Sequence, residues 1–348
     1  MKALIFRGIE TIQYESVADP IIEQPTDVIV KVSACAICGS DLHVYHGREQ
    51  GLDSGTVMGH EFMGEVVEVG KDIKSLRKGD RVMSPFTTSC GQCFYCNIGL
   101  TCRCIRSQLF GWREKSRGLH GTQAELVRVP LAEASLVKVA EGISDEEATL
   151  LGDIIPTGYF CALQAGINPK GVFAVVGCGP VGLMAILGAR ELGAEKIIAF
   201  DKEPARLMMA SRFGAEVVNV SNGDVRERIN ELTEGRGADG VMEAVGHASS
   251  LQLAFDLLRP GGTLSSVGVC TEKSLPFNPT QAYDKNITMK VGRCPARHLM
   301  PKLWPLVQQK KYDFTAIVTH RMNLSEGVDG YKTFASKSDN CLKIILRP

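Results

Sequence analysis

The sequence predicts an α/β protein that combines a doubly wound parallel sheet with a second, mostly antiparallel β-domain. Between about residues 156 and 294, strand and helix signals alternate, which is typical of a doubly wound parallel sheet. Before about residue 155, β-branched runs are instead separated by Gly- and Asp-rich turns. With 348 residues, 44% of them apolar, the chain is long enough for two domains that each bury a core.

The first stretch contains clear strand signals. Val28–Val32 and Glu65–Val69 are β-branched runs, and turns such as Lys78-Gly79-Asp80 separate them. Near the end of this stretch, Ser144 is followed three residues later by Glu147, a spacing that predicts a capping box and a helix start. We therefore expect an antiparallel β-domain over residues 1–155 with a helix at its boundary.

The middle stretch, residues 156–294, predicts the parallel sheet. Strand candidates begin near Val172, Lys196, Glu216, Gly240, Thr263 and Ile287. Helical stretches fill most of the gaps, at 180–193, 203–213, 224–234 and 248–258. Pro260-Gly261-Gly262 is expected to form a turn before the fifth strand.

The last stretch, residues 295–348, contains a helix at 297–309, then short strands and another helix. It ends in the strand-like apolar run Cys341–Leu346. We expect this segment to return to the first domain.

The charges exclude some kinds of partner. Basic and acidic residues balance at 39 each, whereas proteins that bind nucleic acids usually carry a basic excess. No apolar run reaches the roughly 18 residues of a membrane-span candidate. The sequence from Met1 to Arg7 lacks the apolar segment of a signal peptide. We expect a cytoplasmic protein that binds neither nucleic acid nor membrane.

A glycine-rich motif follows the first strand of the middle stretch. Val172–Val176 runs into Gly177, Cys178, Gly179, Pro180, Val181 and Gly182, and then into a helical segment. At such a strand-to-helix turn, the three glycines permit a tight turn, close approach of a pyrophosphate and close helix packing. The helix N-terminus attracts the phosphates. This context predicts a dinucleotide-binding domain of the Rossmann type, with Cys178 as a small filler.

Asp201 ends the second strand of this domain, close to the spacing of about 20 residues at which an acid binds the ribose. Its carboxylate would accept both ribose hydroxyl protons and repel a 2′-phosphate, which predicts NAD rather than NADP. Lys202 and Arg206 bring positive charge nearby, and we give Asp201 the greater weight.

Four of the twelve cysteines form the pattern Cys90-x2-Cys93-x2-Cys96-x7-Cys104. Four thiolates at this range can enclose a tetrahedral zinc with no open position, so we expect a structural zinc. Cys102 competes for the fourth place. A zinc finger for DNA is the functional rival, but the flanks carry no positive charge and no base-reading helix follows. Redox disulfides are a weaker alternative.

Three further segments carry metal-binding residue types: Cys38-Gly39-Ser40-Asp41-Leu42-His43, Gly59-His60-Glu61, and Gly152-Asp153 continuing to Pro156-Thr157-Gly158. Taken singly, each is weak, because a lone Cys or His is usually structural. Together with the cysteine lobe and the glycine motif, in this order, they resemble the medium-chain zinc alcohol dehydrogenases over essentially the whole chain. The resemblance implies a GroES-like fold for the first domain.

The resemblance also implies roles for individual residues. Cys38, His60 and Asp153 would bind a catalytic zinc, with Glu61 as an adjacent acid that can move onto the metal. Ser40 and His43 would relay a proton, and Thr157 would lie against the nicotinamide. Three protein ligands leave the open position that a catalytic zinc needs, where it would act on the alcohol oxygen while hydride passes to the cofactor.

Two features resemble the bacterial secondary-alcohol branch. Asp153 stands where the vertebrate liver type has a second Cys. Trp112 occupies a place where that branch has a pocket-lining Trp, although an ordinary core aromatic explains it equally well. We therefore expect two zinc ions and NAD per subunit, and small or medium secondary alcohols and their ketones as substrates.

Several alternatives stay open. Polyol, threonine and formaldehyde dehydrogenases share the zinc and cofactor elements. A metal-free quinone reductase is disfavoured because it would not need the ligands. A non-enzymatic zinc protein would require a vestigial cofactor site. The family implies a homodimer or homotetramer, for which the helix 297–309 and the strands 263–270 and 286–292 are interface candidates.

Overall fold

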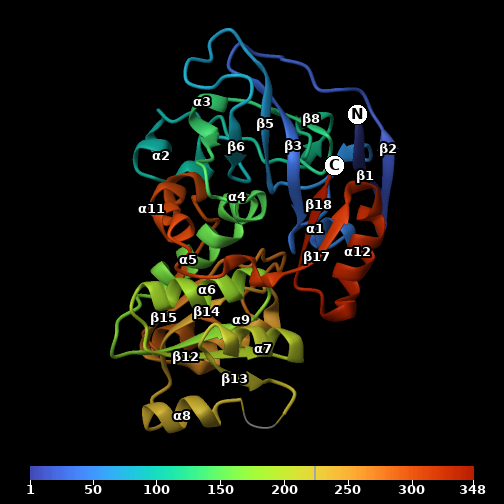
Figure 1. Cartoon of the computed structure of the whole chain (residues 1–348). Coiled ribbons are helices and arrows are strands. Elements are labelled where there is room, and N and C mark those ends of the chain that lie inside the picture. Colours follow the sequence, from blue (N-terminus) through green and yellow to red (C-terminus); the bar gives the residue numbers. More distant parts are fainter. Residues whose placement is uncertain (223–224) are drawn as a thin grey trace. The chain divides into compact units, whose positions relative to one another are not determined.

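The computed structural model describes residues 1–222 and 225–348. The chain divides into two compact units (Figure 1). The first comprises Met1–Asp153 together with Pro295–Pro348, and the second comprises Ile154–Cys294. The C-terminal segment therefore returns to the unit in which the chain begins. Within the described residues, no helix combines the length and apolar character that crossing a membrane needs.

The first unit is built on mostly antiparallel sheets, in which, among the described residues, only the pair β17 and β18 runs parallel. Its largest sheet has the order β10-β6-β5-β3-β18-β17, with β9 also paired to β3, and smaller sheets are formed by β2-β1-β4 and β7-β8. The strands are β1 (Lys2–Gly8), β2 (Thr11–Ser16), β3 (Val28–Ile37), β4 (Thr56–Val57), β5 (Phe62–Val69), β6 (Arg81–Ser84), β7 (Trp112–Glu114), β8 (Arg117–Leu119), β9 (Leu126–Val129), β10 (Val137–Lys138), β17 (Val318–Asn323) and β18 (Lys343–Arg347).

Short helices connect these strands, and longer ones flank the sheets. They are α1 (Asp41–Tyr45), α2 (Phe94–Asn97), η1 (Thr101–Arg103), α3 (Ala132–Ser135), α4 (Asp145–Gly152), α11 (Ala296–Gln308), η2 (Phe314–Ile317), η3 (Leu324–Glu326), α12 (Gly327–Ser336) and η4 (Ser338–Asn340). The predicted capping box is confirmed at α4, where the Ser144 side chain accepts from the Glu147 N–H and Glu147 accepts from the Ser144 N–H.

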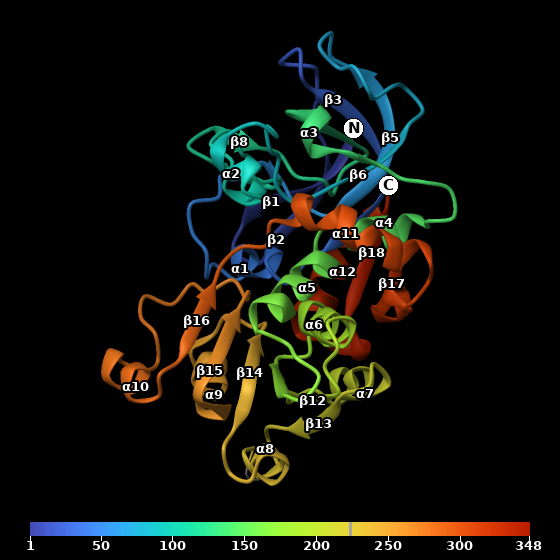
Figure 2. The ribbon, with the colours of Figure 1, turned by 90° about the vertical axis from the view of Figure 1, so that its left-hand side faces the viewer.

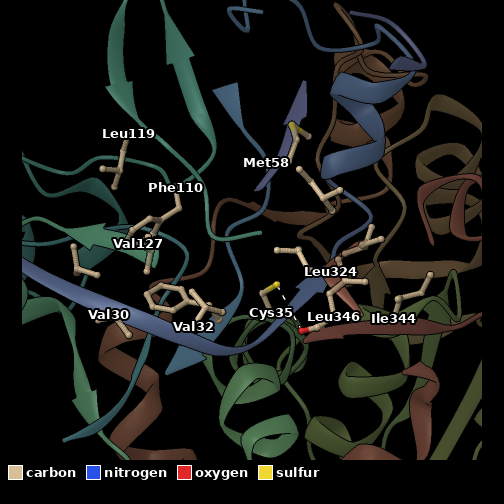
Figure 3. Packing of buried hydrophobic residues seen from close by; sticks show 14 of the residues in the cluster. Val30, Val32, Cys35, Met58, Phe110, Leu119, Val127, Leu324, Ile344 and Leu346 are labelled. Atoms are coloured by element: carbon tan, nitrogen blue, oxygen red, sulfur yellow. Dashed lines mark hydrogen bonds between the residues drawn. The ribbon is translucent and has the colours of Figure 1, made fainter. Parts of the chain in front are cut away.

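Strand β3 is the centre of the first unit. It pairs antiparallel with β5, β9 and β18, so its backbone donors and acceptors are satisfied along both edges. Its apolar side chains join the main hydrophobic cluster, in which Val30 and Val32 lie with Phe110 and Val127 (Figure 3). The Cys35 thiol in this cluster donates to the carbonyl of Leu346 on β18 (Figure 3). This packing fixes the end of β3, from which the next residues leave the sheet.

The second unit contains the predicted parallel sheet, with strand order β13-β12-β11-β14-β15-β16 (Figure 2). Its strands are β11 (Val172–Val176), β12 (Lys196–Asp201), β13 (Glu216–Asn219), β14 (Ala238–Glu243), β15 (Leu258–Ser266) and β16 (Thr288–Val291). Its helices are α5 (Ile154–Gln164), α6 (Pro180–Glu191), α7 (Pro204–Arg212), α8 (Glu227–Thr233), α9 (Ala248–Leu257) and α10 (Pro279–Asp284). Every strand pair in this sheet is parallel.

One prediction about this unit is wrong. Pro260-Gly261-Gly262 does not form a turn ahead of the fifth strand but lies inside β15. The register against β14 shifts there, because Ala238 pairs with Leu258 and Gly240 with Thr263. The extra residues are absorbed as a bulge, in which Gly261 adopts a positive φ of 70°. The helical prediction at 224–234 is confirmed for α8, while its first position, Asp224, lies outside the described residues.

Candidate metal and dinucleotide sites

Three element ends in the first unit bring the predicted catalytic ligands together. Cys38 directly follows β3, and His60 and Glu61 directly precede β5, its antiparallel neighbour. Asp153 is the C-cap of α4. Since each residue sits just beyond a packed element, its backbone is held by the core while its side chain leaves the regular hydrogen-bond pattern.

The donor atoms of Cys38, His60, Glu61 and Asp153 all lie within 4.8 Å of one another, and all four residues are buried. Asp153 Oδ2 lies 3.3 Å from His60 Nε2 and 3.7 Å from Cys38 Sγ. One thiolate, one imidazole and one carboxylate form a donor set that zinc accepts. Burial raises the pKa of Cys38, as do the carboxylates of Glu61 and Asp153, so a metal cation is the natural partner for its thiolate.

A chain of hydrogen bonds orients His60. Asp41 Oδ1 lies 3.2 Å from His60 Nδ1, which leaves Nε2 to face the other ligands. The Cys38 N–H and the Gln123 amide both donate to Asp41 Oδ2, and the Tyr331 hydroxyl donates to Gln123 Oε1. This is the carboxylate–histidine–metal arrangement that fixes ring orientation at metal sites. The sequence reasoning missed Asp41 as a support, although it lies inside the motif that identified Cys38.

Lys343 is a second residue that the sequence analysis missed. Its side chain is fully buried, and its Nζ donates to Glu61 Oε1 at 2.5 Å and to the Ile37 carbonyl at 3.1 Å. Burial lowers the pKa of Lys343, but the negative charges of Glu61, Cys38 and Asp153 and the hydrogen bond to Glu61 together outweigh it, and the pKa is raised. The other oxygen, Glu61 Oε2, is buried without a hydrogen-bond partner among the described residues. An unpartnered carboxylate oxygen among metal-type donors fits a bound cation.

Ser40 and His43, the predicted relay pair, lie on the turn and helix after Cys38. Ser40 Oγ is 3.3 Å from His60 Nε2, so the hydroxyl reaches the ligand cluster. His43 Nδ1 is buried and has no hydrogen-bond partner among the described residues. Burial lowers the pKa of His43, and the charges of Arg48 and His46 lower it further. His43 is therefore neutral near pH 7 and free to accept a proton.

Two segments with aromatic residues lie near the ligands. The Phe86 ring stands edge-on to His60, with ring centroids 6.4 Å apart. Trp112 is half-buried against the main core, and Gly111 before it packs on the carbonyl of Gly59, the residue before His60. The segment that carries Trp112 thus passes beside the ligand segment. Phe86 was not predicted, because no local signal marks it.

The four-cysteine lobe is a second, separate cluster. The Sγ atoms of Cys90, Cys93, Cys96 and Cys104 lie within 4.8 Å of one another. Backbone N–H groups donate to these sulfurs: that of Cys90 lies 3.2 Å from Cys104 Sγ, and those of Cys96 and Ile105 lower the pKa of Cys93 to about 6. Donors aimed at sulfur stabilise the thiolate of Cys93, the form that binds zinc, whereas burial raises the pKa of Cys96 to about 12 and also that of Cys104. Among the described residues, the cluster does not include Cys102, which is buried nearby.

The glycine motif adopts the predicted strand–turn–helix in the second unit. Gly177 follows β11 with a φ of 91°, which only glycine adopts readily. Gly179 caps α6 and Pro180 is its first residue, followed by Val181. A Cβ on Gly182 would collide with the Gly177 carbonyl, whereas a Cβ on Gly179 would meet only Arg206, at 3.7 Å. The turn is therefore tight where the backbone crosses itself and open where a phosphate would approach.

Asp201 ends β12 and is held from three sides. Its Oδ2 accepts from the Cys178 N–H at 2.7 Å, and its Oδ1 accepts from the N–H groups of Lys202 and Glu203. Arg206 Nη1 lies 3.8 Å from Oδ2. Asp201 thus has a fixed carboxylate beside the glycine turn.

Thr157, the residue expected beside the nicotinamide, lies elsewhere in this unit, buried on α5.

Comparisons with known proteins agree with this geometry. The model of the alcohol dehydrogenase GroES-like domain matches residues 24–141, and that of the zinc-binding dehydrogenase matches residues 180–309. The zinc-type alcohol dehydrogenase B of Aspergillus flavus is 43% identical over 342 residues, which cover 96% of this chain and 78% of that protein. The chain therefore belongs to the zinc-dependent medium-chain alcohol dehydrogenase family.

Solved structures give the same result. Alcohol dehydrogenase TADH from Thermus sp. ATN1 has a TM-score of 0.93 and 38% identity, covering 100% of this chain and 99% of that one. The 2R,3R-butanediol dehydrogenase from Bacillus subtilis has a TM-score of 0.84 and 27% identity, with coverage of 100% and 99%. The protein is a zinc-type alcohol dehydrogenase, an oxidoreductase that acts on small-molecule alcohols and couples a GroES-like domain to a Rossmann-type domain.

Proposed function

We propose that this enzyme oxidises secondary alcohols to ketones with NAD, and catalyses the reverse reduction. The observation that carries the proposal is the buried convergence of Cys38, His60 and Asp153, with Glu61 beside them. Three of these groups suffice as protein ligands of a catalytic zinc and leave a position for substrate. Glu61, paired with Lys343, is the fourth and exchangeable donor.

When bound, zinc supplies a Lewis acid for the substrate oxygen, and NAD supplies the hydride acceptor. The chain's own contribution is to hold and move the proton. Ser40 Oγ, which reaches His60 Nε2, stands next to the ligand atoms and accepts the hydroxyl proton of the alcohol as it gives up its own. The neutral imidazole of His43 takes the proton that Ser40 releases and passes it to solvent. Asp41 meanwhile keeps His60 in its ligand orientation.

NAD is favoured over NADP by Asp201. Its carboxylate is fixed by three backbone N–H groups, so it cannot swing away from a 2′-phosphate. The resulting repulsion disfavours NADP. Lys202 and Arg206 contribute to binding the adenosine end, and Gly177–Gly182 binds the pyrophosphate at the start of α6. Thr157 is assigned to the nicotinamide.

Secondary alcohols are favoured by Asp153 as a ligand and by Trp112. The segment that carries Trp112 packs beside Gly59, and this supports the assignment of Trp112 to the substrate pocket. The butanediol dehydrogenase among the structural neighbours is named for a diol whose hydroxyl groups are secondary. Polyol, threonine and formaldehyde dehydrogenation are the competing activities within the family. A cytoplasmic homodimer or homotetramer completes the proposal.

A steady-state panel tests the proposal directly. The purified enzyme is assayed with 2-propanol, 2-butanol, ethanol, sorbitol, threonine and formaldehyde with glutathione, each with NAD and with NADP. The expected order places the secondary alcohols first by kcat/KM, with NAD. A preference for sorbitol or threonine would reassign the substrate and leave the zinc and cofactor sites intact. The variant Trp112→Ala should admit bulkier ketones, and Tyr283→Ala, at an exposed aromatic position on α10, is its control.

A further inference from the structure

Glu243 is a fully buried carboxylate that the dehydrogenase mechanism above does not use. It is the last residue of β14. Its Oε1 accepts hydrogen bonds from the N–H groups of Val245 and Gly246 and from the Ser250 hydroxyl, each at 2.8 Å. Its Oε2 accepts from the Ser266 hydroxyl at 2.7 Å. One side chain thus binds a loop, a helix start and the end of a neighbouring strand.

The position of Glu243 in the sheet is informative. Along the sheet, the strands follow the order β13-β12-β11-β14-β15-β16. The order in which the chain adds strands therefore changes side between β11 and β14. In open α/β sheets, ligands bind outside the carboxyl ends of the strands at such a switch point. The glycine turn after β11 and the loop 244–247 after β14 are therefore the two sides of the dinucleotide crevice. They also touch, because a Cβ on Gly177 would collide with Cγ2 of Val245.

The loop 244–247 is shaped by backbone contacts that leave its amides pointing inward. Gly246 has a φ of 81°, and a Cβ there would collide with the carbonyl of Val269 on the loop after β15. A Cβ on Gly268 would likewise collide with the backbone nitrogen of Gly246. The N–H groups of Val245 and Gly246 consequently face the buried strand end, where only an acceptor can satisfy them. Val245 is 43% exposed, so its side chain offers an apolar surface at the crevice.

We propose that Glu243 is a positioning residue for the dinucleotide. Through the amides of Val245 and Gly246 it holds the loop 244–247 in one conformation, so that Val245 forms a fixed apolar wall of the crevice on which the cofactor packs. This inference rests on the proposed NAD site. Because Glu243 is fully buried, it acts only through the loop: it sets the affinity for NAD and NADH, not the rate of hydride transfer.

Three variants separate this role from general stabilisation. Glu243→Ala removes the acceptor and should raise the dissociation constant for NADH and the KM for NAD by about tenfold or more. The KM for alcohol and the kcat at saturating NAD should change little, and the zinc content should stay the same. Glu243→Gln keeps an acceptor for the two amides and should restore most of the affinity. Ser266→Ala is the matched control, since Ser266 binds the same carboxylate but not the loop; its NADH affinity should stay within about twofold.

Calorimetry with NADH gives the affinities, and hydrogen exchange of the wild-type enzyme gives a test that needs no variant. The amides of Val245 and Gly246 should exchange far more slowly than exposed loop amides before any cofactor is added. Fast exchange there would overturn the proposal, as would wild-type NADH affinity in Glu243→Ala or equal losses in the Ala and Gln variants. If the wild type bound neither NADH nor NADPH, the proposed function would fail. The exchange data would still test whether Glu243 holds the loop 244–247 in one conformation.

Discussion

The ammonium group of Lys343 lies 2.5 Å from the carboxylate of Glu61, and both side chains are fully buried. Lysine and glutamate are almost never fully buried unless they are paired. Burial raises the pKa of Glu61, and the positive charge of Lys343 opposes that shift, favouring the ionised carboxylate within reach of Cys38, His60 and Asp153. A bound zinc would compete with Lys343 for the same carboxylate.

Lys343→Met should therefore destabilise the metal-free enzyme more than the zinc-loaded enzyme. Removing one partner of a buried ion pair costs about 3–5 kcal/mol. In the loaded form, Glu61 can pair with the metal instead, so the loss of melting temperature should be smaller. The melting temperatures of both forms are compared with and without a chelator. The double variant Lys343→Met/Glu61→Gln, which removes both charges, should regain much of the metal-free stability. Equal losses in the two forms would show that Glu61 does not reach the metal.

Elemental analysis should find two zinc ions per chain, one for each ligand cluster. Cys38→Ser should abolish activity, lose one zinc and leave the fold intact. Cys93→Ser should instead lower yield and melting temperature, since a closed zinc site contributes its binding energy to folding. Similar effects from both substitutions would contradict the division into a catalytic and a structural site.

The pH dependence of alcohol oxidation should report His43. Its pKa lies below the ordinary value of 6.5, so the imidazole stays neutral and able to accept a proton as the pH falls from 8 through 6.5. The His43→Ala variant lacks this proton acceptor, and water and hydroxide accept the proton poorly at low pH. The variant should slow most in the acidic part of the profile, and added imidazole should recover part of the rate. Asp329→Ala, at an exposed position on α12, is a control. A His43→Ala profile parallel to the wild-type profile would remove His43 from the relay.

Cofactor choice should follow Asp201. Asp201→Gly removes the repulsion of a 2′-phosphate and should reduce the preference for NAD. Asp201→Ser should go further, because its hydroxyl can bind phosphate alongside Lys202 and Arg206. The measurement is kcat/KM with NAD and with NADP for each protein. A wild-type enzyme that prefers NADP would mean that the basic pair outweighs the carboxylate.

Much of the fold and part of the candidate site could be predicted from the sequence. The periodicity of the apolar residues and the turn signals located the parallel strands, because each strand is a local apolar run. Cys38, His60 and Asp153 were identified because their motifs, each weak when taken singly, together resemble the medium-chain zinc alcohol dehydrogenases. The structure then showed that three separate element ends bring them together.

The residues that were missed depend on long-range pairing. Lys343 reaches Ile37 across 306 positions because β18 pairs with β3, and Tyr331 reaches Gln123 across 208. Nothing beside Lys343 in its apolar run marks it as part of a site. The error at 260–262 is of a different kind. Pro-Gly-Gly favours a turn locally, but the residues before and after it, Leu258 and Thr263, both pair with β14, so the segment forms a bulge within the strand.

The pairing of β3 with β18 also bears on how the protein is made. On one edge of β3, β9 covers Val28–Lys31 and β18 covers Cys35–Ile37. Ribosomes add about 5–20 residues per second, so the 306 positions between Ile37 and Lys343 take roughly 15–60 s to synthesise. During that time the Cys35–Ile37 edge has no strand to pair with, and an unpaired apolar edge invites association with other chains. The nascent polypeptide is thus open to association along the strand that directly precedes Cys38.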